Sequence, residues 1–338
     1  MEKYVLITGG AGFIGTNLCP KLIEKGYNIV IADDFVNSKS CHIKRLQQLY
    51  PGKIDVYKFD INDQQRLEKL FQKYTFEGVV HLAAKKYIDE SFKYPQEYMQ
   101  NNVGSTKLLL DTMTKFGVKK LLFASSVSVY GETKYLPVDE AHPLTPLSPY
   151  AETKKICEQV IEPWAKDNTA IVCRFSNPTG ADDKLMLGDD STMNKSSLIP
   201  YMCRKISAGE KLMFNGNCYN TKDGTTIRDY IHITDLTQIV ADLFEKTTQS
   251  TIVNVARGGE GISILDVLHA FENSLGYKLD YGFGPPRQGD IPAITFATDK
   301  LHSVAKVEYS KTMEDIVSSQ LEFENFKQQN QEDVAENT

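Results

Sequence analysis

Near its start the chain carries a glycine-rich turn, Gly9-Gly10-Ala11-Gly12-Phe13-Ile14-Gly15, between a predicted strand and a predicted helix. Residues 4–8 form a short apolar run suited to a buried parallel strand. From Phe13 apolar residues recur at helical spacing, and Gly26 is a stop signal. Glycines at 9, 12 and 15 permit a tight turn and close approach of the backbone to phosphate. Because the helix N-terminus adds free N–H groups and a positive dipole end, the segment predicts a dinucleotide pyrophosphate site.

An acidic residue follows at the distance that such a site needs. Residues 28–32 predict a second strand that ends at Asp33, about 20 residues after the glycines. A carboxylate there can bind the adenosine ribose and would repel a 2′-phosphate, so the pattern favours NAD over NADP. The alternative is a purely structural turn, because glycine-rich turns are common.

Charge and composition argue against several classes of function. The formal net charge is −6 and no basic run occurs, which argues against a nucleic-acid surface. No apolar stretch reaches the roughly 20 residues of a membrane span, and Met1 leads into a strand rather than a signal peptide. The six cysteines are scattered without a Cys-x-x-Cys pair, so we expect reduced thiols and a cytoplasmic protein. The histidines form no metal-ligand cluster, and we expect His81 to be packed or hydrogen-bonded.

Strand and helix signals alternate through the N-terminal half, as in a doubly wound parallel α/β sheet. Further strands are predicted at residues 54–59, 78–82, 120–125 and 170–175, and helices at 63–74, 95–116 and 149–166. The sequence therefore predicts an NAD-binding Rossmann domain at residues 1–176.

After residue 177 the strict alternation is lost. We expect a polar loop at 181–195, helices at 197–208, 234–247 and 263–275, a strand pair at 212–214 and 226–231, and a strand at 252–255. These elements predict a smaller mixed α/β lobe at 177–320, with some segments returning to the first domain. Residues 321–338 are polar, and we expect a frayed tail there.

Tyr150 and Lys154 are the strongest candidates for chemistry. They lie four residues apart on a predicted helix and therefore share one face. An ammonium beside the phenol, with a positive nicotinamide ring close by, would lower the tyrosine pKa from about 10 toward neutrality. A phenolate can then accept the proton of a hydroxyl while a hydride leaves its carbon. Ser125 and Ser126 end a predicted strand, where such sheets bind ligands, so Ser126 could relay that proton. The alternatives are a chance Tyr-x-x-x-Lys on a surface helix and a strand-end cap.

Further segments between about Tyr4 and Asp299 resemble those of one enzyme family. They are Asp33-Asp34-Phe35-Val36-Asn37-Ser38, Asp60-Ile61, His81-Leu82-Ala83-Ala84-Lys85-Lys86, Asn101-Asn102-Val103, Val129-Tyr130-Gly131, Arg174-Phe175-Ser176-Asn177-Pro178, Arg228-Asp229-Tyr230 and Pro286-Arg287-Gln288-Gly289-Asp290. With the glycine turn and the Ser126, Tyr150 and Lys154 set, they resemble the extended short-chain dehydrogenase/reductase family. Within it, the chain is most similar to the UDP-galactose (UDP-glucose) 4-epimerases.

The resemblance implies an isomerase that holds NAD tightly and regenerates it in each turnover. Tyr150 would take the proton of the sugar 4-hydroxyl, directly or through Ser126, while the C4 hydride passes to NAD⁺. The resulting 4-keto sugar would turn about its pyrophosphate linkage and take the hydride back on the opposite face. The partners implied are a UDP-sugar substrate and a second copy of the chain, in a homodimer made by the helices at 95–116 and 149–166.

The resemblance also implies which residues form the site. The catalytic residues would be Tyr150, Ser126 and Lys154. Cofactor contacts would come from Gly9, Gly12, Phe13, Ile14, Gly15, Asp33, Asn37, Ser38, Asp60, Ile61, Leu82, Ala83, Ala84, Lys86, Asn102, Ser125, Tyr150 and Lys154. Substrate contacts would come from Lys86, Ser126, Tyr150, Asn177, Ser197, Leu198, Met213, Asn215, Arg228, Arg287, Asp290 and Ile294. Arg228 and Arg287 would bind phosphates, where a guanidinium fork is well suited, and Asp290 would hold the uridine ribose.

Some positions depart from the family pattern. Ile294 stands where these epimerases usually have Tyr or Cys, and Ile is shorter than Tyr and forms no hydrogen bond, so an N-acetyl group at C2 could fit. Ser197 replaces a usual asparagine, and Ser176 a usual aromatic residue beside the nicotinamide. The segment Met213-Phe214-Asn215-Gly216 departs from the usual end of the uracil-side strand. These departures bear on the sugar and the base, and not on the Ser126, Tyr150 and Lys154 chemistry.

Other functions remain open from the sequence. The main alternative is a UDP-N-acetylglucosamine/UDP-N-acetylgalactosamine 4-epimerase or a dual-specificity enzyme. A 4,6-dehydratase would need an Asp-Glu pair where this chain has Val127-Ser128. A uronate epimerase or decarboxylase would need cations for the substrate carboxylate, and Arg228 and Arg287 already serve phosphates. An NAD(P)-dependent 4-ketosugar reductase would need exchangeable cofactor. A non-catalytic NAD-binding regulator should have lost Tyr150 or Lys154, and both are present.

Overall fold

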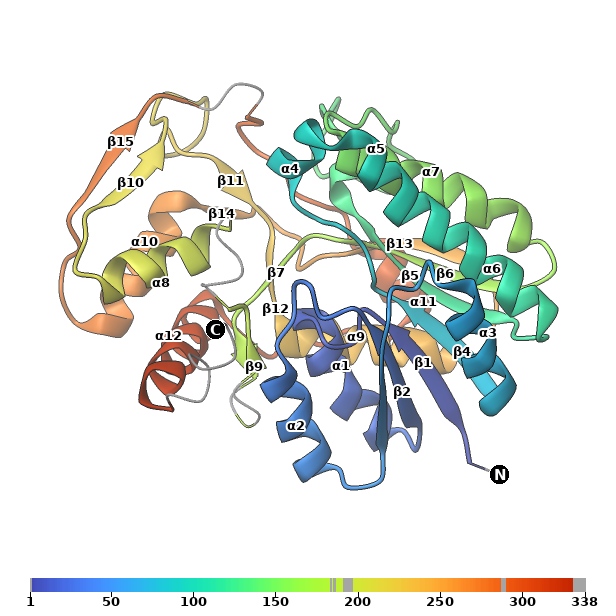
Figure 1. The fold of residues 1–338 in the computed structure, drawn as a ribbon. Helices are drawn as coiled ribbons and strands as arrows, with labels where there is room; N and C mark the ends of the chain where they lie inside the picture. The colour runs from blue at the N-terminus through green and yellow to red at the C-terminus, as the bar shows by residue number, and fades with distance from the viewer. Residues whose placement is uncertain (1, 183, 185–186, 191–196, 287–289, 331–338) are drawn as a thin grey trace.

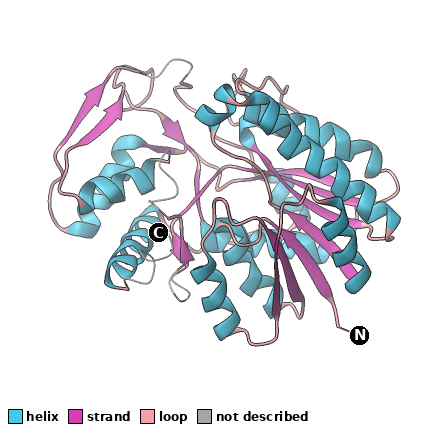
Figure 2. Ribbon diagram, in the orientation of Figure 1, coloured by secondary structure: helices cyan, strands magenta, loops and turns pink. Residues whose placement is uncertain are grey.

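The computed structural model describes residues 2–182, 184, 187–190, 197–286 and 290–330. A seven-stranded parallel sheet lies between two layers of helices, with a smaller lobe beside it (Figure 1, Figure 2). In sheet order its strands are β13 (Thr251–Val255), β6 (Thr169–Phe175), β5 (Lys120–Ser126), β4 (Phe76–His81), β1 (Tyr4–Thr8), β2 (Asn28–Asp33) and β3 (Ile54–Lys58). Most are short apolar runs, as expected for strands buried on both faces.

Two apolar clusters cover the sheet because successive strand residues face opposite ways. Val5 and Ile7 of β1 pack into one cluster, and Leu6 packs into the other. The first layer holds α1 (Phe13–Glu24), α2 (Ser40–Leu49) and α9 (Ile233–Lys246). The second holds α3 (Gln64–Lys73), α6 (Ser105–Lys115) and α7 (Pro149–Trp164).

The sheet order places a ligand crevice beside β1. This strand pairs in parallel with β2 on one side and with β4 on the other, so the chain leaves β1 in one direction and later returns on its other side. Ligands bind at such a switch point, outside the carboxyl ends of the strands. The glycine turn follows β1, residues 82–86 follow β4, and Ser126 ends β5. All three candidate segments therefore lie at one edge of the sheet.

The predicted strands and helices of the N-terminal half agree with the structure to within about two residues at nearly every end, and the predicted fold class is confirmed. The expected helix at 95–116 is instead α5 (Pro95–Tyr98), a π-helical turn η1 (Met99–Gly104) and α6. The sequence analysis did not predict α2, α4 (Ile88–Lys93) or the 3₁₀ turn η2 (Val127–Tyr130).

The smaller lobe has its own apolar core. This core joins α8 (Leu198–Ser207), α10 (Ile264–Leu275), α12 (Met313–Gln329), β10 (Leu212–Asn215) and β15 (Tyr281–Gly284). The remaining elements are β7 (Asn177–Thr179), β8 (Ala181–Asp182), β9 (Leu187–Gly188), β11 (Ile227–Arg228), β12 (Tyr230–His232), β14 (Ile262–Ser263) and α11 (Asp299–Val304). Although they follow residue 177, α9 and β13 pack with the large sheet.

Two expectations for this lobe are wrong. The strand at 212–214 does not pair with 226–231: β10 pairs in parallel with β15, with Phe214 opposite Phe283. The other segment splits, because β11 pairs with β14 and β12 pairs with β7. The expected polar loop at 181–195 contains the β8–β9 pair, and its residues 183, 185–186 and 191–195 lie outside the described residues.

The expected frayed tail from residue 321 is also corrected. Helix α12 continues to Gln329, because Phe323 is only 1% exposed and packs into the protein. A reciprocal pair of hydrogen bonds between Thr312 and Asp315 caps its start. Residues 331–338 lie outside the described residues.

Candidate active site

The glycine turn is shaped to receive an anion. Gly9 has φ +67°, and a Cβ there would lie 2.6 Å from the backbone nitrogen of Ala83. A Cβ on Gly15 would lie 2.5 Å from Cα of Gly10, so helix and turn touch directly. The N–H groups of Phe13, Ile14 and Gly15 make no hydrogen bond to any described residue, because they begin α1. Three free donors at a helix N-terminus fit a pyrophosphate.

Asp33 ties the glycine turn to the loop after β2. One carboxylate oxygen accepts the Ala11 N–H at 3.0 Å, and the other accepts the Phe35 N–H at 2.8 Å and the Ser38 hydroxyl at 2.9 Å. Burial raises the pKa of Asp33, against the lowering effect of these donors. Ser38 therefore donates to Asp33, and Asn37 is exposed beside it. The carboxylate is placed at the strand end where the sequence predicts the ribose contact.

The segments after β3 and β4 complete the cofactor side. Ile61 is buried, and exposed Asp60 accepts hydrogen bonds from Asn62. Residues 82–84 are half-buried at the crevice. Asn102, in the π-helical turn, accepts the N–H of Lys85 at 2.8 Å and donates to its carbonyl at 3.0 Å. It also donates to Thr153 of α7 at 2.9 Å, so it joins the β4 segment to the Tyr150 helix.

Lys86 is exposed, with its ammonium 5.7 Å from the centre of the Tyr87 ring. The neighbouring Lys85 is instead engaged by Glu97, at 2.7 Å. Of these two lysines, Lys86 is therefore the one whose described contacts leave its charge exposed to solvent.

Tyr150 and Lys154 lie in the first turns of α7, and Ser126 lies at the end of β5. Ser148 caps α7 by accepting the Ala151 N–H, and Pro149 occupies the first helical position. The Ser126 side chain lies close enough to the Tyr150 hydroxyl to lower its pKa through hydrogen bonding. Ser126 also accepts hydrogen bonds from the backbone N–H and the hydroxyl of Ser128, at 3.2 and 2.9 Å. The structure thus places the predicted serine beside the predicted tyrosine.

Burial dominates the electrostatics of this group. It raises the pKa of Tyr150 to about 12, although the Ser126 hydrogen bond lowers it. Burial lowers the pKa of Lys154 to about 8. The Lys154 ammonium donates to the Ala124 carbonyl at 2.7 Å. The expected fall of the tyrosine pKa toward neutrality requires the nicotinamide ring as well as the ammonium, and it stays a prediction.

Ser125 faces a buried ion pair that the sequence analysis did not find. Its hydroxyl donates to Glu158 of α7, because consecutive strand residues face opposite ways and Ser126 takes the crevice side. Glu158 receives two parallel hydrogen bonds from Arg174 of β6, at 3.0 and 2.7 Å. Arg174 also donates to the Tyr130 hydroxyl at 2.9 Å. The Ser125 hydroxyl therefore donates its hydrogen bond to this network and not toward the crevice.

On the substrate side, two residues predicted to bind different parts of a nucleotide pair with each other. The Arg228 guanidinium donates to the Asp290 carboxylate at 2.8 Å and to the carbonyls of Ile227 and Ile291. Tyr219 donates to the other Asp290 oxygen at 3.3 Å. Asn177 donates to the Asp229 carbonyl at 2.8 Å. Arg287 lies outside the described residues.

The other predicted substrate residues are spread over the lobe. Ser197 is the N-cap residue of α8 and Leu198 its first residue. Met213 and Asn215 lie on β10, where the Tyr201 hydroxyl bonds both the N–H and the carbonyl of Met213, at 2.9 and 3.1 Å. Ile294 packs against the apolar cluster of Val129, Tyr130, Val138, Ala256 and Phe296, next to the network of Arg174.

No group of His, Cys, Asp and Glu side chains that could hold a metal ion occurs in the described part of the chain. His81 is buried, as expected, with its ring nitrogens hydrogen-bonded to Thr8 at 2.6 Å and Thr106 at 3.2 Å. Burial lowers the pKa of His81 to about 3, so its ring is neutral at physiological pH. Among the described residues, no helix has the length and apolar character needed to cross a membrane.

Comparison with known proteins adds independent evidence. A sequence model described as "NAD dependent epimerase/dehydratase family" matches residues 5–256. UDP-glucose 4-epimerase 4 of Oryza sativa subsp. japonica is 38% identical over 86% of this chain and 81% of its own. The structure of UDP-glucose 4-epimerase from Bifidobacterium longum with NAD⁺ and UDP has TM-score 0.88 and 33% identity, covering 97% and 99% of the two chains. UDP-N-acetylglucosamine 4-epimerase from Methanobrevibacter ruminantium has TM-score 0.84 and 26% identity, covering 97% and 99%.

Proposed function

The chain belongs to the NAD dependent epimerase/dehydratase family, and on that premise we propose that it interconverts UDP-galactose and UDP-glucose by 4-epimerisation. It is an isomerase that uses NAD. The observation that carries the proposal is the placement of Ser126 beside Tyr150 at the sheet edge that also holds the glycine turn. That arrangement puts a proton acceptor beside a dinucleotide site, which is what removal of hydride and proton from one carbinol requires.

The residues described above fit the dinucleotide. The free N–H groups at the start of α1 would bind its pyrophosphate, and Asp33 with the Asn37–Ser38 turn would meet the adenosine ribose. Asp60 and Ile61 would flank the adenine, and residues 82–84, Lys86, Asn102, Ser125 and Lys154 would line the nicotinamide side. When bound, NAD⁺ supplies a hydride acceptor and a positive ring close to the phenol.

Tyr150 is the proposed proton acceptor for the sugar 4-hydroxyl, with Ser126 as the relay. Its pKa of about 12 keeps the phenol protonated at neutral pH in the protein alone. A positive charge brought beside the phenol favours the phenolate, because opposite charges stabilise the ionised form. Lys154 lies on the same helix face as Tyr150, and its ammonium donates to the Ala124 carbonyl. This hydrogen bond orients the lysine side chain on that side of the crevice.

Arg228 and Asp290 are proposed to bind the nucleotide. Arg228 would meet the β-phosphate and Asp290 the uridine ribose, supported by Asn177, Ser197, Leu198, Met213, Asn215 and, by its sequence position, Arg287. The ion pair between Arg228 and Asp290 holds both side chains in place before substrate arrives. The sugar, by contrast, meets the uncharged Ser126, Tyr150 and Ile294, and among the proposed sugar-side residues only Lys86 is charged. Firm binding of the nucleotide and weak binding of the sugar would let a 4-keto intermediate rotate about its pyrophosphate linkage.

Ile294 favours a second candidate substrate, the UDP-N-acetylhexosamine pair. Its side chain is smaller than tyrosine and has no hydrogen-bonding group. The likeness to the UDP-N-acetylglucosamine 4-epimerase of M. ruminantium supports the same alternative.

Proton NMR of the anomeric region tests both substrates in one tube. Purified protein without added cofactor should convert UDP-galactose to UDP-glucose within the time course. Additional UDP-N-acetylglucosamine from UDP-N-acetylgalactosamine would extend the assignment to a dual-specificity enzyme. Formation of neither product, with no rescue by added NAD⁺, would contradict a UDP-hexose substrate.

The proposed NAD-binding and nucleotide-sugar-binding parts of the chain correspond to the two apolar cores. Residues 1–176, with returning elements such as α9 and β13, would hold NAD, and residues 177–320 would mainly hold the nucleotide sugar. The six cysteines, all within the described residues, form no disulfide, which supports the proposed reducing, cytoplasmic location. Fractionation of cells that contain the native protein tests the location, and a membrane-pelleted or secreted pool would contradict it.

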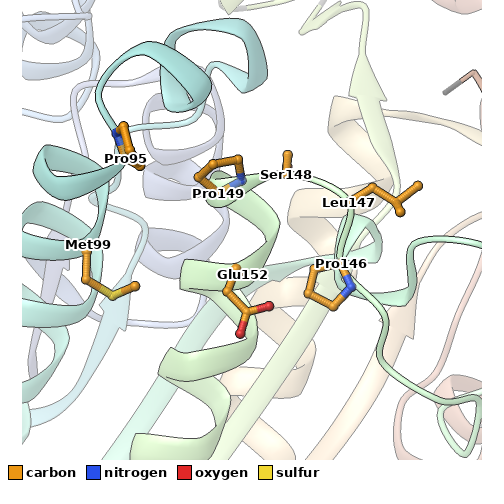
Figure 3. A pocket seen from close by; sticks show the side chains of 7 residues that line it. All are labelled: Pro95, Met99, Pro146, Leu147, Ser148, Pro149 and Glu152. Carbon is orange, nitrogen blue, oxygen red and sulfur yellow. The ribbon is translucent and has the colours of Figure 1, made fainter. Parts of the chain in front are cut away.

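A second copy of the chain is the proposed partner at the start of α7. A groove lies there, and it is lined by Pro95, Met99, Leu147, Pro149, Glu152 and two neighbouring residues (Figure 3). Glu152 is two residues from Tyr150 on the helix, so the groove lies on the opposite helix face from the phenol. Met99 is 39% and Leu147 49% exposed, which leaves apolar surface for the four-helix contact that the family resemblance implies.

Sedimentation equilibrium tests the dimer. We expect about twice the 38.0 kDa of one chain, and a shift toward the monomer in Met99→Glu, because a charge would be buried in the contact. Tyr277→Glu, at a 55% exposed residue of the other lobe, is the matched control and should leave the mass unchanged. A wild-type protein that stays monomeric would contradict the proposal.

A further inference from the structure

Residues 187–190, which we call the strap, lie between α12 and the proposed cofactor site. The β9 strand at its start contacts both α1 and α12 (Figure 1). Its Leu187 carbonyl accepts a hydrogen bond from Asn17 at 3.1 Å. Asn17 is buried one turn into α1, directly behind the free N–H groups of the glycine turn. The strap is thus fastened to the helix that would bind the pyrophosphate.

The strap also reaches the turn on the adenosine side that is proposed to hold NAD. The Asp190 carboxylate lies 3.0 Å from the Lys39 ammonium, and Lys39 follows Ser38, which donates to Asp33. Asp190 therefore links the strap to this turn.

Helix α12 supports the strap from behind. The Lys327 ammonium pairs with Asp190 at 2.6 Å, and both side chains are at most 8% exposed. Gln320 donates to the Asp189 carbonyl at 2.8 Å. Gly188 packs so closely on Phe323 that a Cβ there would lie 2.3 Å from the ring. These contacts fix the strap to α12, and Asp190 also connects the strap to Lys39.

We propose that α12 and the strap retain the dinucleotide, with Asp190 as a positioning residue that couples Lys327 of α12 to Lys39 of the adenosine-side turn. Loosening either end would let the turn open without altering a residue that touches the reacting atoms. The consequence is that a C-terminal helix remote from the chemistry sets how long NAD stays bound. This inference rests on the proposed cofactor site and goes beyond it.

The test measures NAD release and needs no activity. Purified protein is gel-filtered at intervals, and NAD in the protein fraction is quantified after acid release. We expect Lys327→Met to release NAD about tenfold faster than wild type, a size typical of coupling between separate sites. Met retains the aliphatic packing, and Asp190 keeps Lys39 as a partner. Glu324 loses its 2.8 Å ion pair with Lys327 but keeps the hydrogen bond from Gln320, so this variant should fold with reduced stability. Asp190→Asn should release NAD at least as fast, because it removes the ion pairs with both Lys327 and Lys39.

Lys25→Met is the matched control. Lys25 pairs with Asp242 and Glu245 at the opposite end of α1, so its loss should lower the melting temperature and leave NAD release unchanged. Strap variants that are destabilised like this control but release NAD at the wild-type rate would overturn the proposal. A wild-type protein that holds no NAD and does not bind it would contradict the cofactor site instead, so the two failures are distinguishable.

Discussion

Replacing Tyr150 by phenylalanine is expected to lower kcat by about 10²–10⁴-fold, the usual contribution of a positioned proton-transfer group. The variant keeps the aromatic ring and loses only the hydroxyl beside Ser126. Because the nucleotide contacts are untouched, KM for UDP-galactose should change by less than about threefold. Steady-state kinetics on the folded variant measure both quantities.

Tyr135→Phe is the control for this change, since Tyr135 is 44% exposed and its hydroxyl contacts only Asp139 among the described residues. It should leave kcat unaltered. In the wild type, kcat should rise with pH as the phenol ionises. This rise of kcat with pH should be absent in Tyr150→Phe. A Tyr150→Phe enzyme with more than half of the wild-type kcat would refute the assignment of the proton acceptor.

Replacing Arg174 by methionine is expected to lower the free energy of unfolding by about 3–5 kcal/mol. Arg174 and Glu158 are 4% and 5% exposed and share two hydrogen bonds, so the change leaves a buried carboxylate without its cation. Ser125 and Tyr130 lose part of their network as well. Urea unfolding at pH 7, followed by circular dichroism, measures the loss.

Two comparisons isolate the cause. Lys155→Met removes a partly exposed pair of the same helix, at 3.9 Å from Glu152, and should cost less than about 1 kcal/mol. The double variant Arg174→Met/Glu158→Met should recover part of the loss, because both charges are gone. A cost below about 1 kcal/mol for Arg174→Met alone would show that Glu158 finds another partner.

The sheet could be predicted because its strands are short apolar runs separated by helical patterns. Residues 4–8 or 120–125 carry that signal without reference to the rest of the chain. The candidate site followed from the same rule, since Gly9, Ala83 and Ser126 all come after the carboxyl ends of strands, and these ends meet at one edge. Motif and topology together therefore predict that these segments share one edge of the sheet, as they do in the structure.

Contacts between distant segments could not be predicted in this way. Polar residues at 321–330 read as a tail, but Phe323 packs on Gly188 and Lys327 pairs with Asp190, and such contacts with distant residues support the helix there. The pairing of β10 with β15 depends on Phe214 meeting Phe283, which no local pattern reveals. The hydrogen bond from the Lys154 ammonium to the Ala124 carbonyl could not be predicted either, because helical spacing says nothing of that carbonyl.

The most direct test of the account follows deuterium from C4 of UDP-galactose. Purified protein, with no added cofactor, is given UDP-galactose deuterated at C4 and is monitored by proton NMR. We predict UDP-glucose that retains deuterium at C4, since the hydride that leaves the sugar returns to the same carbon. Product with solvent hydrogen at C4, or no product while NAD is present in the protein, would contradict the account.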